Sequence, residues 1–167
     1  MSAGAVVWTP AYVALGSNLD DPAAQVQAAY RALAGWSGVA APRLSPLYRS
    51  TPLGGLSQPD YCNAVAGLLT TLSAERLLAS LLEIEKHRGR TRGGERWGPR
   101  RIDLDLLVFG TQQSNAADLT LPHPGIVSRN FVLYPLADIA PTLDIPGLGV
   151  VNRLRDAVGG DGLKRMS

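Results

Sequence analysis

The order of strand-like and helix-like segments is the feature of this sequence that most constrains its fold. Residues 11–15 form a short apolar run that stops at a Gly-Ser-Asn sequence, which is typical of a buried strand followed by a turn. Apolar residues at helical spacing follow between Pro22, at a favoured first position, and Gly35, at a favoured end, with Asp20 or Asp21 as the cap. The chain is therefore expected to begin with a strand and a helix.

Further segments along the chain continue this alternation. We expect strands at 43–50, where Pro46 requires an edge position or a bulge, and at 61–71, after a loop rich in glycine and proline. An amphipathic helix capped by Ser73 comes next. Residues 102–109 then form a fourth strand.

These segments give the order βαββαβ, in which two split βαβ units form an antiparallel sheet with both helices on one face. We expect an α+β protein: a ferredoxin-like βαββαβ sandwich with an antiparallel sheet and a C-terminal extension, Leu119 to Ser167, that covers the other sheet face. With 167 residues, 46% of them hydrophobic, the chain is long enough for one compact core and too short for two comfortable ones. We predict a single domain over residues 1–167.

Two acids in the last of these strands give the strongest chemical signal. Side chains two apart on a strand share a face, so Asp103 and Asp105 are expected side by side, about 7 Å apart. Their face continues with Leu107 and Phe109, and the opposite face is apolar throughout, with Ile102, Leu104, Leu106 and Val108. The alternative is a solvated edge strand whose acids discourage strand association. Because the acidic face becomes apolar further along, we favour a covered cleft whose polar mouth holds Mg²⁺.

Positive charge is concentrated just before these acids. Seven of the 16 lysines and arginines lie between Lys86 and Arg101, although the formal net charge is only +2. Such a local cluster favours a small anionic ligand over nucleic acid, which needs a broad basic surface. Neither standard glycine-rich phosphate loop occurs, so side chains must hold the phosphates. The candidates are Arg90, Arg92, Arg100 and Arg129, each of which taken alone is an ordinary surface residue.

Aromatic, amide and imidazole side chains are candidates for binding a second ligand. Tyr61 and Phe131 offer stacking surfaces, and Asn63, on the strand face of Tyr61, has the donor and acceptor that suit the edge of a flat heterocycle. Trp97 is a lid over such a ligand or an anchor of its own loop. His123 lies between two prolines, six residues before an arginine, and both can reach one phosphate. The structural alternatives are an amide bonded within the fold and a histidine held in a proline turn.

Cysteine content and the N-terminal sequence limit the compartment. The single cysteine, Cys62, excludes an internal disulfide, and with only two histidines a zinc site is not expected. The first ten residues lack the basic and apolar regions of a signal peptide, and no apolar run is long enough to span a bilayer. We expect a cytoplasmic monomer that binds neither membrane nor nucleic acid.

Four segments together resemble the 6-hydroxymethyl-7,8-dihydropterin pyrophosphokinase family. They are Tyr12–Asn18 (YVALGSN), Tyr48–Gly54 with Gln58–Asn63, Glu95–Asp105 (ERWGPRRIDLD), and Pro122-His123 with Arg129–Phe131. The third is highly specific, and the four in this order run over most of the chain. The resemblance implies an enzyme of folate biosynthesis that transfers pyrophosphate from ATP to 6-hydroxymethyl-7,8-dihydropterin, releases AMP and uses two Mg²⁺ ions.

The resemblance also implies roles for individual residues. Asp103 and Asp105 would bind both metal ions, and Arg90 and Arg100 would assist transfer and product release. The residues expected to bind ATP are Glu85, Arg92, Trp97, Arg100, Thr120, His123 and Arg129. Those expected to bind the pterin are Ser50, Thr51, Leu53, Tyr61, Asn63 and Phe131, with Tyr61 and Phe131 on either side of the ring and Asn63 hydrogen-bonded to it.

Departures from the family pattern lie on the nucleotide side. Gly93-Gly94 stands where some members have a lysine, and Pro124 stands where some have an aromatic residue. Two other functions use related features: a magnesium-dependent nuclease also needs paired acids, and a ferredoxin-like RNA-binding module needs aromatics exposed on its sheet. The few aromatics and the concentrated basic segment count against the RNA-binding module. DNA cleavage, or tight metal binding without ATP, would favour the nuclease.

Overall fold

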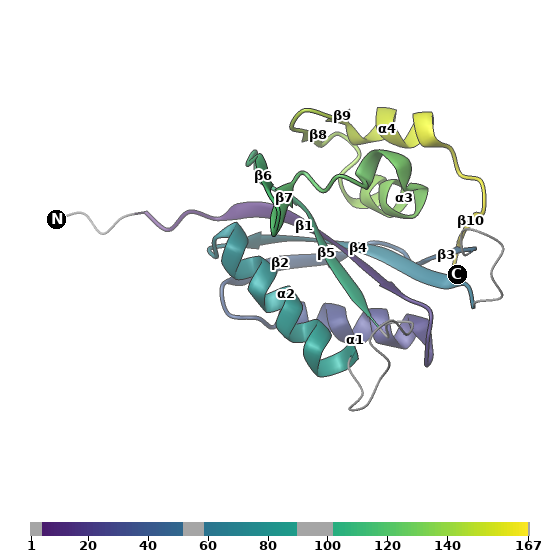
Figure 1. Cartoon of the computed structure of the whole chain (residues 1–167), viewed down its shortest axis with the longest axis horizontal. Coiled ribbons are helices and arrows are strands. Elements are labelled where there is room, and N and C mark those ends of the chain that lie inside the picture. The colour runs from purple at the N-terminus through teal and green to yellow at the C-terminus, as the bar shows by residue number, and fades with distance from the viewer. Residues whose placement is uncertain (1–4, 52–58, 90–101, 167) are drawn as a thin grey trace.

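The computed structural model describes residues 5–51, 59–89 and 102–166, which form layers around one sheet (Figure 1). The helices α1 (Pro22–Ala34) and α2 (Ala74–Gly89) lie on one face, and α3 (Asn130–Ile139) lies on the other with α4 (Val151–Val158) outside it. The strands of the six-stranded sheet are β1 (Thr9–Ser17), β2 (Val39–Leu44), β3 (Tyr48–Ser50), β4 (Tyr61–Thr70), β5 (Asp103–Phe109) and β10 (Leu163–Arg165). Outside it lie the pairs β6 (Ser114–Ala116) with β7 (Leu119–Leu121) and β8 (Asp144–Ile145) with β9 (Gly149–Val150), and the 3-10 turn η2 (Ile126–Ser128).

The central strand β1 determines which residues meet at one end of the sheet. The strand order is β10-β3-β4-β1-β5, β2 pairs with β4, and all these pairings are antiparallel. β1 pairs with β4 from Thr9 opposite Thr70 to Ser17 opposite Cys62. On its other side β1 pairs with β5, where Gly16 lies opposite Asp103. The end of β1 therefore lies between the beginnings of β4 and β5.

The two helices on the first face begin and end where the sequence predicts. The Asp21 carboxylate accepts a hydrogen bond from the Ala24 N–H (3.4 Å) at the start of α1, and Gly35 follows its last residue. At α2 the Ser73 hydroxyl accepts from the Arg76 N–H (3.2 Å). Both caps satisfy amide groups that a helix cannot satisfy internally, which is why these local signals were sufficient.

The prediction of one strand over 43–50 was wrong. β2 and β3 are separate, and between them Ser45 folds back onto β4: its N–H donates to the Val65 carbonyl (2.9 Å), and its hydroxyl accepts from the Val65 N–H (2.9 Å). The interruption lies at Pro46, which has no N–H to extend the ladder. The other predicted strands are present, with β1 longer than expected and β4 ending at Thr70.

A bulge in β5 corrects the predicted alternation of its side chains. Tyr12 pairs with Val108 and Val13 with Leu106, so Leu107 is the extra residue. Val108 therefore joins Leu107 in the apolar cluster beneath α3, and Phe109 joins the cluster beneath α1 and α2. The predicted faces of Val108 and Phe109 were wrong, because a bulge shifts the alternation by one residue.

The two sheet faces cover two apolar cores. The core on the α1 and α2 side includes Leu15, Leu33 and Leu77, all fully buried. The core on the α3 side includes Leu133 and Leu136, also fully buried. Of the C-terminal extension from Leu119, residues 126–158 cover the second face, as predicted, whereas Leu119 and Leu121 belong to the first core and β10 joins the sheet itself. None of the helices in the described ranges is both long and apolar enough to cross a membrane.

Candidate active site

A cavity of about 370 Å³ opens at the end of the sheet where β1, β4 and β5 meet the start of α3. Residues of four strands, β1, β3, β4 and β5, and of one helix line it, so segments distant in sequence converge there. Its lining residues are Ala14, Leu15, Gly16, Ser50, Thr51, Tyr61, Asn63, Ala64, Asp103, Asp105, Arg129, Phe131 and Val132. Eight of the residues proposed from the sequence are among them: Ser50, Thr51, Tyr61, Asn63, Asp103, Asp105, Arg129 and Phe131.

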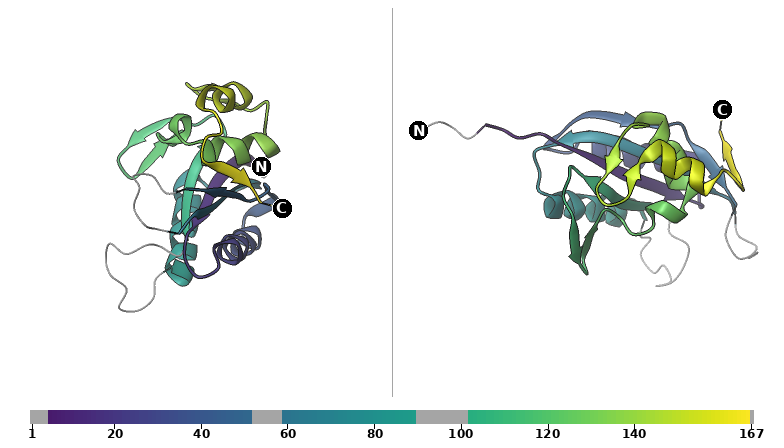
Figure 2. Two further views of the ribbon diagram at one scale, coloured as in Figure 1. Left: turned by 90° about the vertical axis from the view of Figure 1, so that its right-hand side faces the viewer. Right: turned by 90° about the horizontal axis from the view of Figure 1, so that it is seen from above.

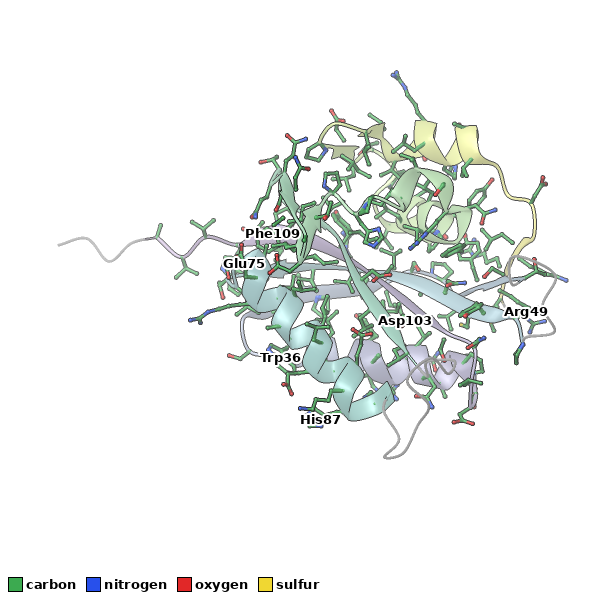
Figure 3. All side chains as sticks on the ribbon, viewed as in Figure 1. Trp36, Arg49, Glu75, His87, Asp103 and Phe109 are labelled. Atoms are coloured by element: carbon green, nitrogen blue, oxygen red, sulfur yellow. The ribbon has the colours of Figure 1, made fainter. Side chains whose placement is uncertain are left out.

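The two acids enter the cavity from the first half of β5. Asp103 lies opposite Gly16 and Asp105 opposite Ala14, and both carboxylates are half-buried. Figure 3 shows Asp103 at the end of β5 away from Phe109. The shared face predicted from their spacing is confirmed, since both line the same cavity. Two carboxylates beside a polar cavity are the hard oxygen donors that Mg²⁺ takes from proteins.

The amide of Asn63 is held in one orientation at the start of β4. Its Nδ2 donates to the Ser50 hydroxyl (2.8 Å), and only 7% of the residue is exposed. Across the strand pair, a Cβ on Gly16 would lie 3.0 Å from the Asn63 Oδ1. Glycine at position 16 therefore allows the amide to lie against β1, and any larger residue would displace it.

Arg129 and Phe131 enter from the first turn of α3. The guanidinium carbon of Arg129 lies 6.0 Å from the centre of the Phe131 ring, within cation–π range. A Cβ on Gly125 would lie 2.7 Å from that same guanidinium carbon. Gly125 is therefore required for this position of Arg129, which brings a permanent positive charge to the cavity that holds the two acids.

His123 lies just outside the lining and is joined to the bulge of β5. Its N–H donates to the Leu107 carbonyl (2.9 Å), and its Nδ1 accepts from the Gly125 N–H (3.0 Å). Burial lowers the pKa of His123, the Asp105 charge opposes that shift, and Arg129 adds to it. The ring is therefore neutral near pH 7 with its proton on Nε2, where it can donate one hydrogen bond to an anion.

Other predicted site residues lie elsewhere. Glu85 is half-buried on α2, and Thr120 lies on β7 with its hydroxyl donating to the Ala116 carbonyl (3.1 Å), so both are outside the cavity lined by described residues. Leu53, Arg90, Arg92, Trp97 and Arg100 fall outside the described residues. Among those that are described, no group of three or more His, Cys, Asp or Glu side chains forms a metal site.

Several residues in and near the cavity had no role assigned to them from the sequence. Ala14, Gly16 and Ala64 line the cavity as small residues, whose shared property is the space they leave. Asn18 is fully buried, and neither atom of its amide has a hydrogen-bond partner in the described structure. The Gly-Ser-Asn sequence after an apolar run is the signal that marks this turn.

Comparison with known proteins relates this site to one family. The family model for 7,8-dihydro-6-hydroxymethylpterin-pyrophosphokinase (HPPK) matches residues 12–141. The chain is 45% identical over 155 residues to the 2-amino-4-hydroxy-6-hydroxymethyldihydropteridine pyrophosphokinase of Pseudomonas aeruginosa, a match that covers 93% of this chain and 95% of the relative. It is 43% identical over 144 residues to the Haemophilus influenzae protein of the same name, covering 86% of this chain and 89% of the relative.

Solved structures share the fold. The HPPK-DHPS protein of Plasmodium falciparum, in its A437G form, superposes with a TM-score of 0.76 at 12% identity. That match covers 98% of this chain and 50% of the solved chain, so the present chain spans about half the length of that protein. At this identity the likeness shows the fold alone, whereas the family model and the bacterial relatives carry the assignment. The chain belongs to the 7,8-dihydro-6-hydroxymethylpterin-pyrophosphokinase family.

Proposed function

We propose that this chain transfers pyrophosphate from ATP to 6-hydroxymethyl-7,8-dihydropterin in folate biosynthesis, giving the pterin diphosphate and AMP. The observation that carries the proposal is that one cavity has two carboxylates on one part of its wall and aromatic and amide side chains on another part. A reaction between a polyphosphate and a flat heterocycle requires a binding site for each of the two substrates, and the two sites must adjoin. Membership of the family supports the same activity.

The pterin is assigned to the part of the cavity lined by Tyr61, Asn63 and Phe131. Tyr61 and Phe131 stack on the two sides of the ring, and Asn63, oriented by Ser50, hydrogen-bonds its edge. An amide already fixed by a neighbour loses little conformational entropy on binding, which favours recognition. We also assign Ser50, Thr51 and Leu53 to the wall of this subsite.

The phosphates of ATP are assigned to the acidic part of the cavity. Asp103 and Asp105 are the carboxylates that would hold two Mg²⁺ ions, which would supply positive charge to neutralise the phosphates of ATP. Arg129 and the Nε2–H of neutral His123 donate to phosphate oxygens from the α3 side. The remaining residues assigned to the nucleotide or to transfer are Glu85, Arg90, Arg92, Trp97, Arg100 and Thr120.

In this scheme the pterin hydroxyl oxygen attacks the β-phosphorus of ATP, and the bond between that phosphorus and the oxygen bridging to the α-phosphorus breaks. AMP leaves with the bridging oxygen, and the hydroxyl proton is lost to solvent. The protein contributes mainly by positioning the two substrates and by placing cationic groups where charge develops. Arg129, which is always charged, serves that role without a change of protonation.

We further propose that residues 1–167 form a single pyrophosphokinase domain with a ferredoxin-like core, acting as a cytoplasmic monomer. The antiparallel order β3-β4-β1-β5, with α1 and α2 together on one face, supports the ferredoxin-like arrangement. The C-terminal segment shares an apolar core with the sheet, which supports one domain.

Identification of the products tests this function. The chain is incubated with ATP, Mg²⁺ and 6-hydroxymethyl-7,8-dihydropterin, and the phosphorus-containing products are identified by ³¹P NMR. AMP and a pterin diphosphate in equal amounts are expected, and both should disappear when a chelator removes the magnesium. ADP with a pterin monophosphate, or hydrolysis without use of the pterin, would overturn the proposal.

A further inference from the structure

The C-terminal segment after α4 runs down to the edge of the sheet at β3 (Figures 1 and 2), the strand whose Ser50 lines the cavity. It ends in β10, which pairs antiparallel with β3 so that Leu163 lies opposite Ser50. The Thr51 N–H donates to the Gly162 carbonyl (3.3 Å), and the Met166 N–H donates to the Leu47 carbonyl (2.8 Å). The wall formed by Ser50 and Thr51 is therefore held from outside by residues near the end of the chain.

The same segment is joined to the opposite wall of the cavity through one side chain. The Nδ2 of Asn130 donates to the Gly159 carbonyl (3.1 Å) and to the Asp161 carbonyl (2.9 Å), so both amide hydrogens are used. Asn130 is the first residue of α3 and lies between Arg129 and Phe131, both of which line the cavity. Neither Asn130 nor residues 159–166 line it themselves.

Packing and a second polar link draw β3 toward α3 in the same region. A Cβ on Gly160 would lie 3.0 Å from the Tyr134 hydroxyl, so the segment passes against the hydroxyl end of that side chain. Tyr134 of α3 makes an edge contact with Tyr48 of β3, with ring centres 6.4 Å apart, and the Tyr48 hydroxyl donates to the Asp138 carboxylate. β3 and α3 are thus joined directly, from Tyr48 at the start of β3 to Tyr134 and Asp138 further along α3, and also through residues 159–166.

We propose that Asn130 is a positioning residue that, with the C-terminal segment 159–166, sets the spacing between the Phe131 and Thr51 walls of the pterin subsite. The inference rests on the proposed function, since it concerns the substrate assigned to that cavity. It extends the site to residues beyond 141, where the match to the family model ends. Loss of the link should weaken pterin binding while leaving ATP binding unchanged.

Asn130→Asp is the most direct variant. The carboxylate has nearly the same shape but cannot donate, and it faces two carbonyl oxygens, so both bonds are lost. A negative charge in the first turn suits the helix dipole, which keeps α3 itself stable. Two neutral hydrogen bonds in a partly exposed setting correspond to a rise of about tenfold in the pterin KM. The ATP KM and kcat are expected to stay within about twofold of the parent values, a split that general destabilisation would not produce.

One glycine of the segment and one outside it provide a matched pair of variants. Gly162 and Gly149 both have positive φ angles, 74° and 111°, so alanine strains the backbone at either position. A Cβ at Gly162 would lie 3.0 Å from the Thr51 Oγ1, whereas a Cβ at Gly149, in β9, meets nothing within 4 Å. Gly162→Ala should therefore raise the pterin KM, and Gly149→Ala should lower the thermal midpoint without changing that KM.

The experiment measures pterin KM, ATP KM, kcat and the thermal midpoint for the parent and the three variants, with amide hydrogen exchange at Thr51. A raised pterin KM and faster Thr51 exchange in Asn130→Asp, absent in Gly149→Ala, support the proposal. An unchanged pterin KM in Asn130→Asp, or an equal rise in Gly149→Ala, would overturn it while the parent's activity stands. A parent that releases no AMP in response to the pterin would overturn the proposed function and this inference together.

Discussion

The two faces of the sheet are built by different interactions. On the α1 and α2 face, buried leucines such as Leu33, Leu77 and Leu81 pack against the sheet, and short local caps set the helix boundaries. On the α3 face, an apolar core is joined by directional polar links between distant residues, such as Asn130 to the C-terminal segment and His123 to the bulge of β5. The cavity lies on the second face. Apolar packing tolerates any side chain of suitable volume, whereas a site needs fixed orientations, which hydrogen bonds supply.

The largest expected effect is a loss of activity without a comparable loss of stability, from a substitution in the cavity on the α3 face. Asp105→Asn removes a charge that the phosphates and metal ions require, so the rate of AMP release should fall by about 10²–10³-fold. The thermal midpoint should change by no more than a few degrees, because the half-buried carboxylate is not part of an apolar core. Steady-state rates and calorimetry measure both quantities. Asp156→Asn, at an exposed residue whose carboxylate pairs with the neighbouring Arg155, is the control and should keep the parent rate.

On the α1 and α2 face, Leu77→Ala should lower stability and leave activity nearly unchanged. Leu77 is fully buried, and truncation leaves a cavity, so the free energy of unfolding should fall by about 3 kcal/mol. At this chain length such a loss lowers the thermal midpoint by about 10 °C. The activity of the folded fraction at 20 °C should remain within about threefold of the parent value. A large fall in kcat at a temperature where the variant is folded would show that the two faces are not separable in this way.

Phe131→Ala tests whether the pterin and the ATP bind to different parts of the cavity. Stacking of a heterocycle on an aromatic side chain is worth about 1–3 kcal/mol, so the pterin KM should rise by about tenfold to a hundredfold. The ATP KM serves as the internal control and should change far less. Equal increases in the two KM values would instead mean that Phe131 acts on the whole cavity, through its contact with Arg129.

The smallest effect concerns the Tyr48 link between β3 and α3, and it depends on pH. Burial first, and then the hydrogen bond to Asp138, raise the pKa of Tyr48 from 10.0 to about 12. Between these values the unfolded chain has lost the phenol proton and the folded chain retains it, so stability falls as pH rises through this range. Denaturant unfolding at a series of alkaline pH values should show a steeper loss for the parent than for Tyr48→Phe. Identical slopes would contradict the role assigned to this hydroxyl.

The parts of the molecule that sequence predicts well are those determined by local interactions. The caps at Asp21 and Ser73 depend on residues three positions apart, and the shared face of Asp103 and Asp105 depends only on strand geometry. These acids line the same cavity as Tyr61 and Asn63 because of the strand order, and the resemblance to the family predicted that the four residues would share a site.

The parts that sequence did not predict depend on distant partners. The bulge at Leu107 depends on the pairing of β5 with β1 and on the hydrogen bond from the His123 N–H. Neither partner belongs to β5, so the sequence of this strand alone does not predict the bulge. Ser45 interrupts the predicted strand because its partner, Val65, lies on β4. Asn130 bonds to residues 29 and 31 positions away, so its spacing in sequence carries no signal.

The most direct test of the proposed function is the initial rate of AMP release from ATP and Mg²⁺ as the concentration of 6-hydroxymethyl-7,8-dihydropterin is raised from zero, for the parent and for Asp105→Asn. We expect no AMP without the pterin, a saturable rise with it in the parent, and a curve at least about a hundredfold lower in the variant. AMP release by the parent that does not depend on the pterin, or equal curves for parent and variant, would contradict it.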